Sequence, residues 1–472
     1  MSDRTRSIRW TWLLGAAVTL FLFLLVLLVA LTRPTAAPDP RPTGSADDIA
    51  KLAERSDVNV LFILIDTLRA DRLSAYGYER ETSPELDRLA AGGVRFARQL
   101  SQSSWTKCSM ASLWTGMNPS RNGVTRFDDV VPEVAEMPAE IFKNAGFATV
   151  GVYRNGWVSP NFGFAQGFDV YTRPAPAPPP PDVRRENPTL KEAGTDEDVI
   201  STAIEYLRVN GRERWFLYLH LMDVHEYTYD EQSALFGGSY SDVYDNSIRR
   251  VDALIGVLLD YLAESGLAEK TLVVLTADHG EAFRERGVEG HARRVYRETT
   301  EVPLLLALPF RLEPGVVVTS RSRNIDVWPT VLGLLGLPIP EAIDGRSLVP
   351  EMLASARGEP LAEPAGPTGI AHLDMTWGQS AKDPLPTVAI AQGPYRYVKV
   401  TEAGKTFERL YDASVDPKEL IDRATAEPEK LAELRGIGEE YLQQVPPWGE
   451  APTRELSEME LNQLRALGYA LP

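Results

Sequence analysis

Residues 58–66 read VNVLFILID, an almost uninterrupted apolar run that ends on Asp66. A run of this kind, rich in Val and Ile, is typical of a strand buried on both faces of a parallel sheet. Similar runs recur at 147–152, 215–221, 271–276 and 303–309. Stretches with helical periodicity lie between them, at 84–92, 132–145, 196–208, 240–265 and 325–336. The alternation predicts an open α/β sheet with helices on both faces.

Polar residues stand where several of these runs end. Asp66, Asp223 and Asp278 each lie just past an apolar run, and His279 follows Asp278. Ligands of open α/β sheets bind beyond the carboxyl ends of the strands. Taken singly, each of these residues is also typical of a helix cap or a turn. Together, Asp66, Asp278 and His279 offer the oxygen and nitrogen ligands of a divalent ion, and we expect them to share one.

Composition excludes several other classes of protein. The chain has 472 residues, 44% of them hydrophobic, with 66 acidic residues against 49 basic ones and a net charge of −17. This length allows two to four domains, or one large α/β domain with an appendage. The acidic balance argues against a nucleic-acid partner. Cys108 is the single cysteine, so an intrachain disulfide and a cysteine-rich zinc site are excluded.

The N-terminal residues predict a membrane anchor. Trp10–Leu31 comprises 22 residues without a charge, which as a helix would span about 33 Å and match a bilayer core. Three arginines precede this span, so we expect a cytoplasmic tail over 1–9, a single transmembrane helix over 10–32 and an extracytoplasmic, periplasmic catalytic part. A Pro- and Ala-rich linker is predicted over 33–56. The alternative is a cleaved signal peptide, although such apolar regions are usually shorter.

The character of the chain changes after about residue 365. Residues 387–392 and 395–401 flank a Gly-Pro pair as a hairpin does, and an amphipathic helix is predicted over 427–443. We therefore divide the globular part into a catalytic domain over 57–365 and a small C-terminal α+β subdomain over 366–472.

Four segments carry a resemblance to a known family. They are DTLRADRLSAYGY (66–78), SWTKCSMASLWTG (104–116), LHLMDVH (219–225) and TADHGEAFRERGVEGH (276–291). With FGFAQGFD (162–169), residues 326–348 and RLYDASVDPKE (409–419), they resemble sulfatases of the alkaline phosphatase superfamily and the related phosphoethanolamine and glycerol-phosphate transferases. The resemblance implies a mixed sheet flanked by helices, one divalent metal ion (Mn, Ca, Mg or Zn) and a sulfate or phosphate ester as substrate.

The resemblance also implies which residue is the nucleophile. Members with a formylglycine carry Cys or Ser, then Pro two residues on and Arg four on, shortly before an A-S-L-x-T-G helix. The nucleophile lies ten residues before the final glycine, which here is Thr106, and Cys108 falls on the proline position. Counted from Cys108, the two positions hold Met110 and Ser112, so the modification motif fails in both registers. Thr106 is therefore predicted to be an unmodified, metal-coordinated nucleophile, and Cys108 a packing residue.

Other family positions depart from the pattern. Thr67 stands where many sulfatases have a second aspartate, and the Lys-x-His pair of the next strand is replaced by Arg154 and Asn155, which we expect to contact the anion. His225 matches a substrate-binding histidine, and His291 stands in place of a lysine. The alternative role for these two histidines is a second metal ion, shared with Asp223.

Three histidine and arginine positions complete the prediction. Arg69 is a further candidate for a substrate contact, whereas His220 and His372 are interpreted as residues of the sheet or its rim.

We therefore expect a membrane-anchored, metal-dependent hydrolase. Thr106 would attack the sulfur or phosphorus of the ester, while His225 or His291 would support the group or protonate the leaving oxygen. A transferase shares the first half of this reaction and is the alternative. The loss of the second Asp and of the Lys-x-His pair leaves a non-catalytic binding protein as a further alternative. The sequence indicates no oligomeric state.

Overall fold

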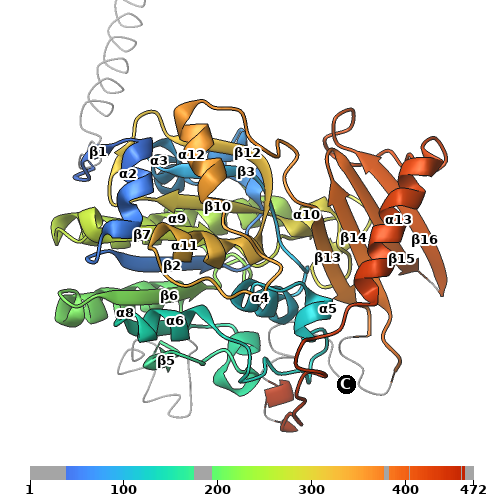
Figure 1. The fold of residues 1–472 in the computed structure, drawn as a ribbon, viewed down its shortest axis with the longest axis horizontal. Coiled ribbons are helices and arrows are strands. Elements are labelled where there is room, and N and C mark those ends of the chain that lie inside the picture. The colour runs from blue at the N-terminus through green and yellow to red at the C-terminus, as the bar shows by residue number, and fades with distance from the viewer. Residues whose placement is uncertain (1–38, 175–193, 377–381, 403, 459, 463–472) are drawn as a thin grey trace, which may run out of the picture. The chain divides into compact units, whose positions relative to one another are not determined.

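An eight-stranded mixed sheet is the centre of the unit formed by Arg41–Pro472 (Figure 1). The computed structural model describes residues 39–174, 194–376, 382–402, 404–458 and 460–462. The strand order is β12 (Val316–Arg323), β3 (Val94–Leu100), β10 (Glu301–Ala307), β7 (Thr271–Thr276), β2 (Asn59–Ile65), β6 (Trp215–Leu221), β4 (Ala148–Tyr153) and β5 (Val170–Thr172). Strand β10 runs antiparallel to both of its neighbours, and the other pairs are parallel.

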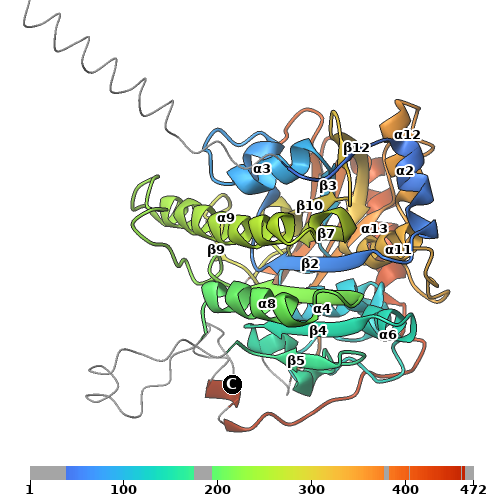
Figure 2. The same ribbon diagram turned by 90° about the vertical axis from the view of Figure 1, so that its left-hand side faces the viewer.

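Helices cover both faces of this sheet, as Figures 1 and 2 show. One face packs against α3 (Pro84–Ala91), α8 (Asp196–Asn210) and α9 (Tyr240–Glu264). The other packs against α2 (Ala46–Lys51), α4 (Thr106–Thr115), α6 (Pro138–Asn144), α11 (Val327–Leu334) and α12 (Val349–Arg357). Strand β2 serves both cores, because successive side chains of a strand point to opposite faces: Phe62 lies in the second and Ile63 in the first. This is why its apolar run is unbroken.

Short elements connect these layers. They are α5 (Pro119–Asn122), α10 (Arg297–Thr300), β8 (Ala282–Phe283), β9 (Glu289–Gly290), η2 (Ala70–Arg72), η3 (Ser74–Tyr76), η4 (Gly156–Val158), η5 (Pro160–Phe162), η6 (Ala268–Lys270) and η7 (Asn324–Asp326).

The predicted mixed α/β class is confirmed, but three strands of the eight-stranded sheet, β3, β5 and β12, were not predicted. The runs predicted at 58–65, 147–152, 215–221 and 271–276 form β2, β4, β6 and β7 within one residue at each end. Strands β3 and β12 were not predicted, because their arginines interrupt the apolar pattern. The helix predicted over 132–145 begins only at Pro138, whose fixed φ suits the first helical position.

Part of the predicted linker is folded onto the sheet. Strand β1 (Thr43–Gly44) pairs with β11 (Arg311–Leu312), and α2 continues into η1 (Leu52–Glu54). Ile49 and Leu52 are buried in the core, so the linker prediction is wrong for these residues. The predicted tail and anchor over 1–32 lie outside the described residues. Among the residues that the structure does describe, no helix has the length and apolarity to cross a membrane.

The C-terminal part forms a second, antiparallel sheet. Its order is β13 (Gly369–Asp374), β14 (Pro386–Gln392), β15 (Tyr395–Glu402) and β16 (Lys405–Asp412). Helix α13 (Pro428–Leu442) packs on this sheet through Leu434 and Tyr441. The predicted hairpin is therefore β14–β15, and its turn residue Gly393 has a φ of +56°, which favours glycine.

An aromatic cluster packs helix α4 against the central sheet and α11. Every residue of α4 is buried. Trp114 on this helix stacks on Trp328 of α11, with ring centroids 5.0 Å apart and planes 18° from parallel. Tyr218 of β6 meets Trp114 edge-on at 5.0 Å, and Phe62 lies 4.8 Å from Trp328. These contacts hold the C-terminal end of α4, at Trp114, against α11 and the middle of β2 and β6.

Candidate active site

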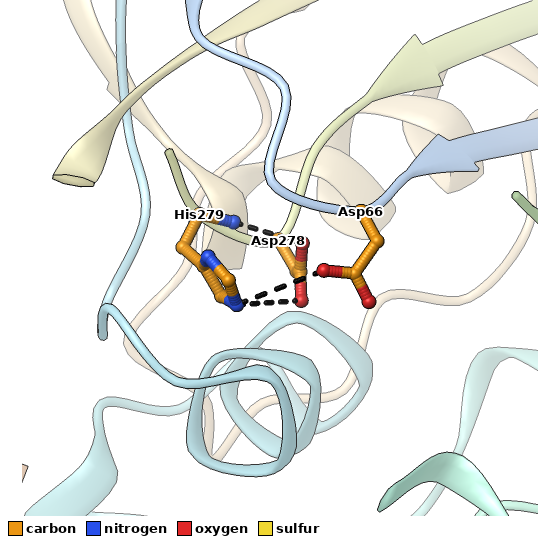
Figure 3. Close-up of side chains that lie close together, drawn as sticks. All are labelled: Asp66, Asp278 and His279. Carbon is orange, nitrogen blue, oxygen red and sulfur yellow. Dashed lines mark hydrogen bonds and ion pairs between the residues drawn. The ribbon is translucent and has the colours of Figure 1, made fainter. Parts of the chain in front are cut away.

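Two neighbouring parallel strands bring the predicted metal ligands together. Asp66 follows β2, and Asp278 and His279 follow β7, which pairs with β2. One ligand atom from each of the three residues lies within 4.8 Å of the other two, and all three residues are buried. Figure 3 shows their side chains pointing toward one another.

The two carboxylates differ in which oxygen is satisfied. Asp66 Oδ2 accepts a hydrogen bond from Asn155 Nδ2 at 2.6 Å and lies 3.1 Å from His220 Nε2. Asp278 Oδ1 accepts from the backbone N–H of His279 at 3.0 Å. Within the described residues, the buried Asp66 Oδ1 and Asp278 Oδ2 have no hydrogen-bond donor. Both of these oxygens face His279 Nε2, at 3.8 and 3.3 Å.

The ring of His279 is oriented as a metal ligand would be. Its Nδ1 lies 3.0 Å from the carbonyl oxygen of Gly280, which can only accept a hydrogen bond. In the neutral ring the proton is therefore on Nδ1, and the lone pair of Nε2 faces the two carboxylate oxygens. Two anionic oxygens and one imidazole nitrogen converge in a buried space. This donor set fits a divalent cation, which would compensate the buried negative charge.

The pKa values of the two carboxyl groups are shifted in opposite directions. Burial and the neighbouring Asp66 carboxylate raise the pKa of Asp278. Burial also opposes ionisation of Asp66, but the nearby rings of His225 and His220 hold the pKa of Asp66 well below its ordinary value. Two carboxylates this close repel each other, and a shared cation would relieve that repulsion.

Thr106 lies beside this set, at the first residue of α4. Its Oγ1 is 3.2 Å from His279 Nε2 and 3.4 Å from Asn155 Nδ2. Ser109, one turn further on, donates to the backbone carbonyl of Asp278 and ties the helix to the end of β7. The N-terminus of a helix favours an anionic group, because its first N–H groups have no partner within the helix.

Thr67 does not replace the second aspartate of the family. Its Oγ1 donates to the carbonyl of Asp66 at 2.6 Å, so the hydroxyl is engaged by the backbone. Its φ is +62°, which is strained for a β-branched residue. The hydroxyl of Tyr244 donates to the Thr67 carbonyl at 2.7 Å and accepts from the N–H of Arg69 at 2.9 Å, which holds this turn in place.

Two further histidines adjoin the metal-ligand set. The ring of His291 lies 4.6 Å from that of His279 and 4.9 Å from that of His225. His291 Nδ1 is 3.1 Å from Glu281 Oε2. Burial lowers the pKa of His225 to about 4. For His291 burial acts in the same direction, but the Glu281 carboxylate outweighs it and raises the pKa of His291.

Arg154 and Asp223 contact each other and not the metal-ligand set. The Arg154 guanidinium is 2.6 Å from both Asp196 and Asp223 and also pairs with Glu226. Asp223 is contacted from its other side by Arg250 Nε at 3.3 Å. Asp66, Asp278 and His279 are the one group in the described part of the chain with metal-ligand spacing. Asp223 is not part of this group, and its carboxylate is paired with the guanidinium groups of Arg154 and Arg250.

Arg69 is similarly committed. It pairs with Asp71 at 2.8 Å and with Glu285, and its Nη1 donates to the carbonyl of Glu281 at 2.8 Å. These contacts hold the segments after β2 and β7 together, so Arg69 is engaged within the protein and not directed at a ligand.

Cys108 is buried in the core, two residues into α4. Its Sγ lies 3.8 Å from the carbonyl oxygen of His372. Burial raises the pKa of the Cys108 thiol to about 12. A thiol of this kind is protonated and unreactive near neutral pH.

His220 was interpreted as a sheet residue, and the structure gives it a further contact. It lies in β6, opposite Leu64 of β2, and its Nε2 reaches Asp66. The signal in the sequence was a histidine in the last part of a fully buried strand, where a polar side chain needs a partner. His372, in β13, instead pairs with the hydroxyl of Tyr441 at 3.0 Å.

Comparison with known proteins shows similarity to sulfatases. The Sulfatase family model matches residues 58–337. An ulvan-active sulfatase of Formosa agariphila is 26% identical over 414 residues, 79% of each chain. Arylsulfatase K of Xenopus laevis is 30% identical over 187 residues, which are 39% of this chain and 33% of that relative. The chain thus matches about a third of that relative's length.

Solved structures show the same fold. A phosphonate monoester hydrolase of Agrobacterium radiobacter superposes with a TM-score of 0.64 at 18% identity, over 84% of this chain and all of the other. The fold and the site define an α/β protein of the alkaline phosphatase type with a buried Asp-Asp-His group. The chain belongs to the sulfatase family.

Proposed function

We propose that the protein is a metal-dependent hydrolase of sulfate or phosphate esters, with Thr106 as its nucleophile. One observation carries the proposal: the Thr106 hydroxyl stands 3.2 Å from His279 Nε2, beside two buried carboxylate oxygens that lack a hydrogen-bond donor in the described structure. Membership of the sulfatase family supports an anionic ester as the substrate.

Asp66, Asp278 and His279 would hold the divalent cation. When bound, the cation supplies Lewis acidity, which lowers the pKa of a neighbouring hydroxyl and neutralises negative charge on the transferred group. The protein's own contribution is the fixed placement of Thr106. The buried helix start and the Ser109 contact to Asp278 hold the hydroxyl in position before substrate arrives.

Thr106 would lose its hydroxyl proton to water as its Oγ forms the new bond to sulfur or phosphorus, and the bond to the leaving oxygen would break in line with the new one. The leaving oxygen takes a proton from His291, whose pKa is raised by Glu281, while His225, whose pKa is lowered to about 4, would support the transferred group as a neutral ring. Water then attacks the Thr106 ester and releases free sulfate or phosphate. Asn155 Nδ2, 3.4 Å from Thr106 Oγ1, is placed to donate to an oxygen of the transferred group.

A pair of matched variants tests the nucleophile. Thr106→Ala should lower turnover by about 10⁴-fold or more, because the residue that forms the covalent bond is gone. Thr106→Ser keeps the hydroxyl and should retain measurable turnover. Cys108→Ala removes a buried thiol two residues away in the same helix and should keep most of the activity.

The assay compares aryl sulfates, phosphate monoesters and phosphodiesters with added Mn²⁺, Ca²⁺, Mg²⁺ or Zn²⁺. Mass spectrometry of the native peptide should show an unmodified Thr106 and an unmodified Cys108. Turnover that survives Thr106→Ala but is lost in Cys108→Ala would show that the register is wrong.

We also propose that the catalytic unit is held outside the cytoplasm by the predicted anchor over 10–32. The uncharged stretch Trp10–Leu31 and the arginines before it support this. A phosphatase reporter that folds only outside the cytoplasm should be active when it is fused after Pro472. Activity of a cytosolic reporter alone at the same position would refute the orientation.

A further inference from the structure

A chain of buried polar contacts runs from the aromatic cluster to the metal-ligand set. The hydroxyl of Tyr218 lies 2.7 Å from His220 Nδ1, and His220 Nε2 lies 3.1 Å from Asp66 Oδ2. All three residues are fully buried. Tyr218 and His220 project from the same face of β6, two residues apart, toward the side that carries α4.

The direction of each hydrogen bond follows from the chemistry of the partners. A carboxylate oxygen can only accept a hydrogen bond, so His220 Nε2 carries a proton and donates the hydrogen bond to Asp66 Oδ2. In a neutral ring Nδ1 is then an acceptor, and the Tyr218 hydroxyl donates to it. Burial raises the pKa of Tyr218 well above its ordinary value, so this hydroxyl keeps its proton. Tyr218 thereby selects the ring tautomer that can donate to Asp66.

This bond helps to fix the orientation in which the Asp66 carboxylate presents its other oxygen to the cation position. Oδ2 receives donors from His220 and Asn155, whereas the buried Oδ1 has no hydrogen-bond donor in the described structure. Rotation of the carboxylate plane by a quarter turn would lose both bonds. The family's second aspartate is replaced by Thr67, whose hydroxyl is bonded to the backbone. One carboxylate fewer is available, so the orientation of Asp66 matters more.

We propose that His220 is a positioning residue for the metal centre, which it serves by fixing Asp66 through the Tyr218–His220–Asp66 hydrogen bonds. The inference rests on the proposed function, in which Asp66 holds the cation. His220 would act through Asp66, because its two ring nitrogens contact the Tyr218 hydroxyl and Asp66 Oδ2. Partners of this kind behind a metal ligand typically change metal affinity by about 10- to 100-fold when removed.

The experiment measures Mn²⁺ affinity of the full-length protein by electron paramagnetic resonance of the free ion. His220→Leu removes the donor at similar volume and should weaken Mn²⁺ binding by about 10- to 100-fold. His220→Gln places an amide N–H near the position of Nε2 and should restore most of the affinity. Tyr218→Phe keeps the ring in the aromatic cluster but removes the hydroxyl, and should weaken binding less than His220→Leu does.

The chain provides a matched control in a second Tyr–His pair. His372 is also buried and contacts the hydroxyl of Tyr441, but its ring has no contact with Asp66, Asp278 or His279. His372→Leu should lower thermal stability as a buried polar substitution does, and should leave Mn²⁺ affinity unchanged. This comparison separates positioning from a general loss of stability.

Each outcome has one meaning. Equal Mn²⁺ affinity of wild type and His220→Leu overturns the positioning role while the metal site stands. Equal losses in His220→Leu and His220→Gln also overturn it, because the donated hydrogen bond then has no effect. Absence of Mn²⁺ binding by the wild-type protein overturns the proposed metal function first, and this inference with it.

Discussion

Replacing Asp278 by Asn tests the charge balance of the metal-ligand set. Asp66 and Asp278 offer oxygens within 4.8 Å of each other. Two unit charges at that distance repel by about 3.5 kcal/mol at an effective dielectric constant near 20. The asparagine can keep the hydrogen bond from the His279 N–H through its Oδ1. Its Nδ2 would then donate toward Asp66 and His279 Nε2.

Asp278→Asn should therefore raise the free energy of unfolding of the metal-free protein, by about 1–3 kcal/mol once partial compensation is allowed for. Addition of Mn²⁺ reverses the order. A ligand at 100 times its dissociation constant stabilises the wild type by about 2.7 kcal/mol, whereas the variant has lost a ligand and gains little. The measurement is urea unfolding in EDTA and again in excess Mn²⁺.

Asp223→Asn is the matched control, because Asp223 is equally buried but faces Arg154 and Arg250. Loss of the Asp223 charge leaves the Arg154 guanidinium less well paired and should destabilise the protein with or without Mn²⁺. The reasoning fails if Asp278→Asn is less stable than wild type in EDTA, or if Mn²⁺ stabilises the two proteins equally.

Two further predictions concern the core. Burial raises the pKa of Cys108 to about 12, above its value in the unfolded chain, so the thiol's contribution to stability is complete below pH 9 and is lost as the pH rises toward 12. Iodoacetamide at pH 8.5 should accordingly alkylate Cys108 only after unfolding, and rapid labelling of the native protein would contradict this. Ile49→Ala in α2 should lower the free energy of unfolding by about 2–4 kcal/mol, because Ile49 is buried. An unchanged free energy of unfolding for Ile49→Ala would instead indicate that this segment is a linker that does not contribute to the core.

The sequence predicted those features that local pattern determines. Strand β2 could be recognised because both of its faces are buried, which leaves an unbroken apolar run before Asp66. The carboxyl ends of parallel strands meet at one edge of a sheet, so Asp66 and Asp278 could be expected to lie close together. Their catalytic and metal-binding roles stay predictions.

Other features depend on partners that are distant in the chain. Arg154 was expected to face an anion, but Asp196 and Asp223, 42 and 69 residues further on, occupy its guanidinium. The partner of His220 lies 154 residues away in the sequence. A pattern of residue types contains no record of such pairs, because each depends on how the strands are ordered in the sheet.

The stacked pair of Trp114 and Trp328 provides an intrinsic optical probe of how helix α4 packs against α11. Rings 5.0 Å apart and 18° from parallel couple their electronic transitions, which gives a paired signal in circular dichroism. Trp114 shares its helix with Thr106, while Trp328 belongs to α11. Any event at the helix start that shifts α4 against α11 would therefore alter this optical signal, without a label and without a turnover assay.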